Sequence, residues 1–260
     1  MARPDLAVTE PIGAEGAPLI VLGPSLGTAS AVLWEDVVPI LAQRFRVVTW
    51  DLPGHGTSKP PTGPFTVEDL ADAVADAVRS LGEPVFAAGV SLGGAVTQAL
   101  AIRHGDLLRA VAVVCSGPNF AAGAEAWLER AATVRAQGTP VLISASAGRW
   151  FAPGSIAARP DITGRLLHTL SDADDEGYAA CCEALAEFDV RDQLGSVTRP
   201  MLVMYGSDDT ATPKADSEAI AAAVPDARLV GIDDAAHLAP AEKPVEVATE
   251  LVTFFEGSSR

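Results

Sequence analysis

The chain has 260 residues, of which 48% are hydrophobic, 5% aromatic and 20% charged. This length and mixture are typical of one globular domain with a sizeable core, and they exclude a disordered chain. Lys and Arg number 18 against 34 Asp and Glu, which gives a formal charge of -16. Because such a charge repels a polyphosphate backbone, the composition argues against nucleic-acid binding.

The start of the chain and the cysteines indicate a soluble protein of the cytoplasm. The first residues, MARPDLAVTE, lack the basic and apolar regions of a secretion signal. No run of about 18 apolar residues occurs elsewhere, so we expect no membrane partner. Three cysteines cannot form a closed set of disulfides, and we interpret Cys115, Cys181 and Cys182 as buried small residues. The four histidines lack the spacing of metal ligands, so the sequence predicts no metal and no cofactor.

Short apolar runs alternate with helical patterns along most of the chain. This alternation is typical of a mostly parallel sheet with helices on both faces, which is an α/β fold. All six predicted strands are nearly continuously apolar, as strands covered on both faces should be. They are Leu19–Gly23, Arg46–Asp51, Val85–Ser91, Ala110–Ser116, Met201–Gly206 and Ala227–Ile232.

Helix signals lie between and after these strands. Thr66 and Asp69 predict a capping box at the start of an amphipathic helix. Its apolar stripe, at steps of three and four, consists of Val67, Leu70, Val74, Val78 and Leu81. A second striped helix is predicted from Leu92 to near Gly105, and a third over Val245–Phe255.

The alternation breaks between about Pro118 and Leu194, where Ala, Arg and acidic residues dominate. The only branched strand signal in this stretch is Val141–Ser144. We expect a helical insertion, and because it follows the carboxyl end of a strand it should cover a binding site as a lid. The sequence thus predicts a core of residues 1–117 and 196–260 with a helical cap of residues 118–195.

The run Gly89-Val90-Ser91-Leu92-Gly93 spells G-x-S-x-G, a motif that places a serine on a sharp turn from strand to helix. Its glycines leave room for backbone that a Cβ atom would block. A predicted strand enters the motif and a helical pattern leaves it, which is the setting the motif requires. We therefore predict that Ser91 is a nucleophile and not part of an ordinary glycine-rich turn.

A serine nucleophile needs a base, and the base needs a carboxylate that holds its tautomer. Asp208 and Asp209 follow the fifth predicted strand, and His237 follows the sixth, so the chain order is serine, acid, histidine. The pattern G-x-x-D-x-x-x-P selects Asp209 as the acid and leaves Asp208 as a solvated or turn-capping residue. We predict that His237 is the base.

The other three histidines have structural interpretations. His55 shapes a turn between glycines, and His168 lies on a cap helix. We expect His104 to lie near the C-terminus of a helix, where a cation meets the helix dipole.

The oxyanion formed by serine attack needs N–H donors. One is expected from Leu92, at the positive end of its helix, and the other from the loop after the first strand. In that loop Pro24 has no N–H, which leaves Ser25 or Leu26, and we favour Leu26.

These motifs resemble the α/β-hydrolase superfamily and, within it, the 3-oxoadipate enol-lactone hydrolases of aromatic-acid catabolism. The stretches that carry the resemblance are Ser25–Thr28, Asp51 with Gly54–Gly56 and Ser58, Gly89–Gly94, Glu176–Leu185 and Ala236–Leu238. The triad motifs are shared by the whole superfamily, whereas the oxyanion loop and Glu176–Leu185 are more particular to the lactonases. Two positions depart from the lactonase pattern: Leu52-Pro53 replaces a basic residue before Gly54, and Leu92 stands where many lactonases have Met.

The resemblance implies an α/β-hydrolase fold with an inserted helical cap, and hydrolysis of a small ester or lactone, foremost a 3-oxoadipate enol-lactone. It also implies that Arg149 and Trp150 face the substrate. We add Ser25 and Trp127 as candidate substrate contacts. From the residues alone, Trp127 and Trp150 fit the core of the cap equally well, and Arg149 could be solvated. An anionic substrate would need a local cation in a protein of charge -16, and Arg149 is the first candidate.

Other functions on this scaffold stay open. A haloalkane dehalogenase or an epoxide hydrolase would need Asp at position 91, so both are excluded. A cofactor-free perhydrolase or a C–C bond hydrolase would use the same triad. A non-catalytic ligand-binding relative would keep the pocket without turnover. The sequence leaves the oligomeric state open, a homodimer included.

Overall fold

The computed structural model describes residues 3–120 and 123–258, and its six parallel strands form one sheet in the order β2-β1-β3-β4-β5-β6. The strands are β1 Leu19–Gly23, β2 Arg46–Thr49, β3 Val85–Val90, β4 Leu108–Val114, β5 Met201–Gly206 and β6 Ala227–Ile232. The predicted parallel α/β sheet is confirmed. The strand order reverses at β1, which lies between β2 and β3. A crevice opens at the carboxyl ends of two strands where such a reversal occurs, and it is the usual ligand site of this architecture.

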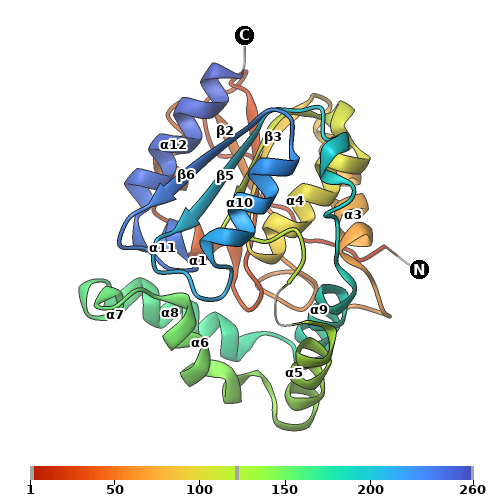
Figure 1. Cartoon of the computed structure of the whole chain (residues 1–260), viewed down its shortest axis with the longest axis vertical. Helices are drawn as coiled ribbons and strands as arrows, with labels where there is room; N and C mark the ends of the chain where they lie inside the picture. Colours follow the sequence, from red (N-terminus) through yellow and green to blue (C-terminus); the bar gives the residue numbers. More distant parts are fainter. Residues whose placement is uncertain (1–2, 121–122, 259–260) are drawn as a thin grey trace.

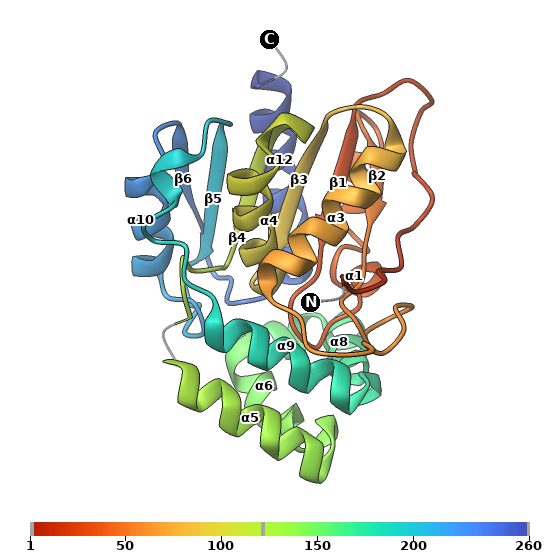
Figure 2. The same ribbon diagram turned by 90° about the vertical axis from the view of Figure 1, so that its right-hand side faces the viewer.

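Helices cover both faces of the sheet, as Figures 1 and 2 show. On one face lie α3 (Val67–Leu81), α4 (Leu92–Arg103) and α10 (Lys214–Ala223). The other face carries α12 (Pro244–Gly257), which contacts the short helix α2 (Val38–Leu41). Two further short helices are α1 (Ser30–Leu33) and α11 (Ala239–Glu242).

Burial along the sheet differs from the prediction at one edge. Strands β1 and β3 are buried throughout, but most residues of β6 are partly or fully exposed. The expectation that all six strands are covered on both faces is therefore wrong for β6. β6 ends the sheet with β5 as its one neighbouring strand, whereas β2 at the other end also pairs with the preceding segment through Ile12 and Val47.

The start of α3 has the predicted capping box. The Thr66 Oγ1 accepts a hydrogen bond from the Asp69 N–H at 3.1 Å, and Asp69 Oδ2 accepts one from the Thr66 N–H at 3.0 Å. Both bonds satisfy N–H groups that a helix start leaves unpaired. The helix ends at Gly82, whose φ of 80° is left-handed.

Helix α4 differs from its prediction as a striped helix. Its residues from Leu92 to Ala101 are all buried, so it has no solvent-facing stripe. It contacts β3 and β4 of the sheet and, on another side, α3, which lies beside it on the same face of the sheet. A helix that is covered on several sides has apolar residues all round. It therefore lacks the polar face that, together with an apolar stripe, marks an amphipathic helix.

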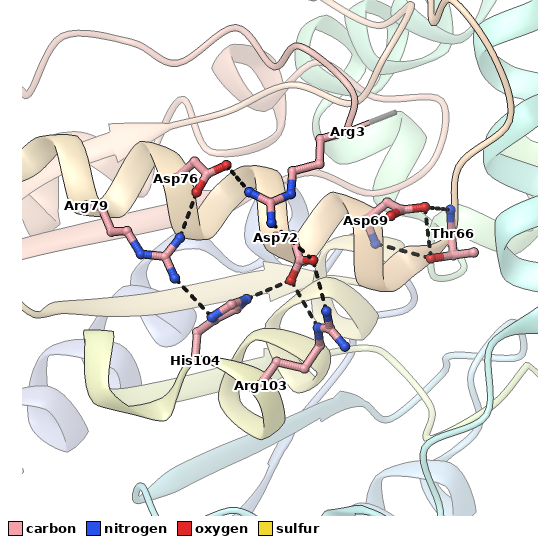
Figure 3. Close-up of polar contacts among 8 residues, drawn as sticks. All are labelled: Arg3, Thr66, Asp69, Asp72, Asp76, Arg79, Arg103 and His104. Carbon is pink, nitrogen blue, oxygen red and sulfur yellow. Dashed lines mark hydrogen bonds and ion pairs between the residues drawn. The ribbon is translucent and has the colours of Figure 1, made fainter. Parts of the chain in front are cut away.

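A polar network joins α3 to the end of α4 (Figure 3). Asp72 accepts two hydrogen bonds from Arg103, at 3.0 and 2.9 Å, and its Oδ1 lies 2.7 Å from His104 Nε2. Nδ1 of His104 lies 3.3 Å from Nη2 of Arg79. Both ring nitrogens of His104 thus lie close to a polar partner in this network. His104 is the C-cap residue of α4, so its predicted place near the C-terminus of a helix is confirmed.

Residues 118–120 and 123–195 include a layer of helices over the ends of the strands (Figure 2). They are α5 Gly123–Gln137, α6 Ile143–Trp150, α7 Ser155–Ala158, α8 Pro160–Asp172 and α9 Asp175–Glu187. The chain enters and leaves this layer at one place, where the Val190 N–H donates to the Pro118 carbonyl at 2.9 Å. Cys181 and Cys182 are buried free thiols on α9, and Cys115 is likewise buried and free.

The weak strand signal at Val141–Ser144 is wrong. Thr139–Leu142 form a 3-10 helix, and α6 begins at Ile143. A strand here would have no sheet to pair with, so the backbone satisfies its own hydrogen bonds in helical turns. No helix in the described ranges has the length and apolar character needed to span a membrane.

Candidate active site

Ser91 lies on a strained turn between β3 and α4, with φ of 54° and ψ of -114°. Its N–H donates to the Val114 carbonyl at 3.0 Å, and its own carbonyl accepts from Ser116 Oγ at 2.7 Å. Such a φ is unusual for a residue with a side chain and is retained where the surroundings hold it. The turn therefore presents the hydroxyl at the carboxyl end of the sheet.

The glycines of the motif are required by close backbone contacts. A Cβ at Gly89 would lie 2.1 Å from the Gly93 carbonyl oxygen, and one at Gly93 would lie 2.4 Å from the Pro24 carbonyl oxygen. The Gly93 N–H also donates to that Pro24 oxygen at 2.9 Å. This contact ties the loop after β1 to the first turn of α4.

Asp209 and His237 form a buried pair. Nδ1 of His237 lies 2.9 Å from Asp209 Oδ2, and both side chains are almost fully buried. Asp209 Oδ2 also accepts from Thr212 Oγ1 at 2.7 Å, and Oδ1 accepts from the Ala211 N–H at 2.8 Å. Asp208 is exposed. The structure thus brings Asp209, and not its neighbour, to the imidazole.

The pKa of the Asp209 carboxyl lies below its ordinary value. Burial by itself raises this pKa, but the charge and hydrogen bond of His237 and the hydrogen bonds from Thr212 outweigh it. Asp209 is therefore a carboxylate at neutral pH. As an acceptor, it fixes the proton of His237 on Nδ1 and leaves Nε2 free to take a proton.

Two backbone N–H groups near Ser91 have no acceptor among the described residues. The Leu92 N–H is in the first turn of α4, where no carbonyl of the helix can reach it. In the loop after β1, the Ser25 N–H already donates to Thr28 Oγ1 at 3.1 Å, whereas the Leu26 N–H is unpaired. Of the two candidates left open in this loop, the geometry favours Leu26.

Ser91 and His237 line one pocket beneath the cap. Ser25 and Leu26 line it from the loop after β1, and Trp127, Arg149 and Trp150 line it from α5 and α6. All four predicted substrate contacts thus line the same pocket as Ser91 and His237, and Asp209 is hydrogen-bonded to the imidazole of His237. Ser25, Ser91 and His237 line the pocket from the loops at the ends of the strands, and the cap helices line it from the other segments. A pocket with a few polar groups is suited to nucleophilic attack on a small molecule.

A family model described as the alpha/beta hydrolase family matches residues 16–250. The chain belongs to the alpha/beta hydrolase family. It is 34% identical over 233 residues to 3-oxoadipate enol-lactonase 2 of Acinetobacter baylyi, covering 89% of this chain and 86% of that protein. It is 35% identical over 252 residues to a pimeloyl-acyl-carrier-protein methyl ester esterase of Aeromonas hydrophila subsp. hydrophila, with coverage of 92% and 96%.

The solved structure of the enol-lactonase from Burkholderia xenovorans LB400 superposes on this hydrolase with a TM-score of 0.92 at 32% identity, covering 96% of each chain. The predicted resemblance to this superfamily and to its enol-lactonases is confirmed. Similarity to lactone and ester hydrolases over nearly the whole length supports an ester or lactone hydrolase.

The pocket of the hydrolase holds two arginines without a carboxylate partner. Neither Arg130 nor Arg149 forms an ion pair among the described residues, although many surface arginines do. Arg130 lies 5.4 Å from the Trp127 ring centroid, and its Nη1 is 3.4 Å from the Tyr178 hydroxyl. Burial, and then repulsion by Arg130, lower the pKa of Arg149. The pocket is therefore a local positive region in an acidic protein.

Trp127 adds an unpaired donor to this region. Its side chain is buried, with 8% of the residue exposed, and its Nε1–H has no acceptor among the described residues. Buried polar groups are nearly always paired, so an unpaired donor on a residue that lines the pocket is a candidate contact for a ligand acceptor.

Sequence reasoning missed Arg130, Tyr178 and Thr212 as pocket residues. Arg130 lies one turn after Trp127 on α5, so the predicted contact at Trp127 could have indicated it through the helical spacing. Thr212 stands inside the G-x-x-D-x-x-x-P pattern, but no spacing signal marks its hydroxyl as a partner of Asp209. His55 is buried under the cap, where its ring stacks on Tyr178, and His168 is on α8.

Proposed function

We propose that this protein hydrolyses the ester bond of a small, carboxylate-bearing enol-lactone through an acyl-enzyme at Ser91. The observation that carries the proposal is one pocket lined by Ser91, His237 and two arginines that have no carboxylate partner among the described residues. The similarity to 3-oxoadipate enol-lactonases supports the lactone as the substrate class.

In the first half of the reaction, the Ser91 hydroxyl attacks the lactone carbonyl while His237 Nε2 takes its proton. Asp209 stabilises the imidazolium that forms. The N–H groups of Leu26 and Leu92 donate to the oxyanion of the tetrahedral intermediate. When the intermediate collapses, the ring C–O bond breaks, His237 returns its proton to the enol oxygen, and the opened acyl chain stays attached to Ser91.

In the second half, His237 takes a proton from a water molecule that attacks the acyl-enzyme carbonyl. A second tetrahedral intermediate forms on the same two N–H donors and then collapses. The Ser91 oxygen leaves with the proton held by His237, and the freed acid carries the hydroxyl of the water. The enol ketonises to the oxo acid.

The unpaired cations suit a substrate that keeps a free carboxylate beside the reacting ester. Arg149 and Arg130, with the Nε1–H of Trp127, offer donors on the cap side of the pocket, opposite the triad on the sheet side. Hydrogen bonds between a guanidinium and a carboxylate are among the stronger ones in proteins. Ser25 and Trp150 would complete the walls around the ring.

A matched substrate pair tests the proposal. The purified protein is assayed on a carboxylated enol-lactone, on the same lactone with its carboxylate methylated, and on a neutral aryl acetate, with the Ser91→Ala variant as the control. We expect turnover that depends on Ser91 and a kcat/KM at least about tenfold higher for the free carboxylate, as one charged hydrogen bond implies. Equal kcat/KM values for the matched pair would contradict the substrate class.

Three further assays separate the competing functions. A fluorophosphonate that fails to label Ser91 would favour a non-catalytic binding protein. Peroxide-dependent halogenation that exceeds ester cleavage would favour a perhydrolase. A preference for cleaving the methyl ester of an acyl chain attached to acyl-carrier protein would favour the activity named for the methyl ester esterase relatives.

A further inference from the structure

Glu242 is a buried carboxylate at the end of α11, five residues after His237, and only 7% of it is exposed. Its Oε1 accepts hydrogen bonds from the Ala152 N–H at 2.7 Å and from Ser155 Oγ at 2.6 Å. Its Oε2 accepts one from the Ala236 N–H at 2.8 Å. One side chain thus bridges the cap segment 150–155 and the residue directly before His237.

The residue directly after His237 is also bound to the cap. The Leu238 N–H donates to the Trp150 carbonyl at 3.1 Å. His237 is therefore held on both sides by bonds that end on the segment 150–155, and Trp150 itself lines the pocket. Figure 1 shows α11 next to the cap helix α7, which begins at Ser155.

The charge of Glu242 is stabilised by hydrogen bonds without a cation. Among the described residues, no Lys, Arg or His nitrogen forms an ion pair with it, and its three donors are two backbone amides and one hydroxyl. A buried carboxylate is costly unless its oxygens are well supplied with donors. Two of the donors, Ala152 and Ser155, belong to the cap, and the third, Ala236, precedes His237. The relative position of these two segments sets the distance between His237 and a substrate bound by the cap.

We propose that Glu242 is a positioning residue that couples the cap to His237. Through Ala236 it positions the imidazole at the pocket that Ser91 also lines, and through Ala152 and Ser155 it makes that placement depend on the cap. A shift of segment 150–155 would move both neighbours of His237, Ala236 through Glu242 and Leu238 through the Trp150 carbonyl. This inference rests on the proposed function, in which His237 moves the proton of Ser91.

The Glu242→Gln variant tests this role with little change in shape. A glutamine has one acceptor oxygen, and its amide nitrogen cannot accept from an N–H, so either Ala236 or Ala152 loses its partner. A small displacement of a general base is costly in rate, so we expect kcat on a neutral aryl acetate to fall about tenfold or more. KM should stay within about twofold, because the pocket walls are kept.

Glu246→Gln is the matched control, since Glu246 is an exposed glutamate on α12 and loses the same charge. Its kcat should equal that of the unmodified protein. A Glu242→Gln protein with lowered thermal stability but unchanged kcat would overturn the proposal, because the residue would then be structural only.

Ser155→Ala supplies a second test, which holds even if Glu242→Gln does not fold. It removes one donor from Glu242 and leaves both backbone donors in place. We expect kcat to fall about two- to threefold and the NMR resonance of the His237 Nδ1 proton to shift. In a double variant the two effects should not multiply, because both act through one carboxylate.

An unchanged His237 resonance in Ser155→Ala, or independent effects in the double variant, would overturn the coupling. Failure of the proposed function gives a different result. In that case the unmodified protein shows no Ser91-dependent turnover, while the resonance still reports on the link between the cap and His237.

Discussion

Nδ1 of His237 lies 2.9 Å from Oδ2 of Asp209, while Asp208, the preceding residue in the chain, is exposed. Two adjacent carboxylates of equal chemistry thus have different surroundings. In Asp209→Asn the amide can hold the imidazole in the wrong tautomer, so we expect kcat to fall about 10⁴-fold. Asp208→Asn should keep kcat within about twofold. Steady-state assays on a soluble aryl ester measure both, and equal losses would show that the pair at 2.9 Å has no catalytic role.

Ser91 should be the residue that carries the acyl group. Ser91→Ala should lower kcat by about 10⁴-fold or more, because no other group can form the covalent intermediate. Mass spectrometry after fluorophosphonate treatment should place the label on the peptide with Ser91. Ser80→Ala, at an exposed position on α3, should retain full activity and full labelling. A label on any other serine would refute the assignment.

The two pocket arginines should act on binding of charged substrates. Arg149→Gln and Arg130→Gln should each raise KM for a carboxylated lactone about tenfold, which corresponds to the loss of one charged hydrogen bond. The KM of a neutral aryl acetate should not change, since it lacks the carboxylate. Arg165→Gln on the exposed side of α8, where the residue pairs with Glu35, is the control. A loss of the same size on both substrates would mean that the arginines support the cap and not the substrate.

The Asp72 network should make stability depend on acid pH. The hydrogen bond from Arg103 is the main cause that lowers the pKa of Asp72 from 3.8 to about 2. A carboxyl with a lowered folded-state pKa stabilises the protein above its ordinary pKa, and this contribution is lost as pH falls through the folded value. The free energy of unfolding should therefore fall between pH of about 4 and about 2.

Urea unfolding at a series of pH values measures this effect. Asp72→Asn should be less stable than the unmodified protein at neutral pH, and the difference should shrink toward about pH 2. Asp106→Asn, at an exposed position without a hydrogen bond from a side chain among the described residues, should show no such difference. A constant gap between Asp72→Asn and the unmodified protein over the whole range would contradict the linkage.

The strands and the serine turn were predictable because their signals are local. Three strands, β1, β5 and β6, begin and end at the predicted residues, and the capping box at Thr66 and Asp69 is present as expected. A covered parallel strand must be apolar along its length, and a crowded turn must have glycine. Both requirements can be read from a few neighbouring residues.

The failures have a common cause in tertiary packing. The alternation of apolar and polar residues is lost in α4 because the sheet and α3 both cover it, and β6 is exposed because it ends the sheet without the additional pairing that β2 has. The polar partners of His104 in the structure, Asp72 and Arg79, likewise lie 32 and 25 residues earlier in the chain. None of these surroundings is encoded near the residue concerned.

The sequence by itself determined the alternation of strands and helices, the turn at Ser91 and the order of serine, acid and histidine, because each depends on residues close together in the chain. Only the tertiary structure decided that Arg130 joins Arg149 without a carboxylate, that the Leu26 N–H and not the Ser25 N–H is unpaired, and that Glu242 links the cap to the His237 loop. These features consist of contacts between segments far apart in sequence. Hydrogen bonding and charge pairing depend on distance in space, and the folded chain sets that distance.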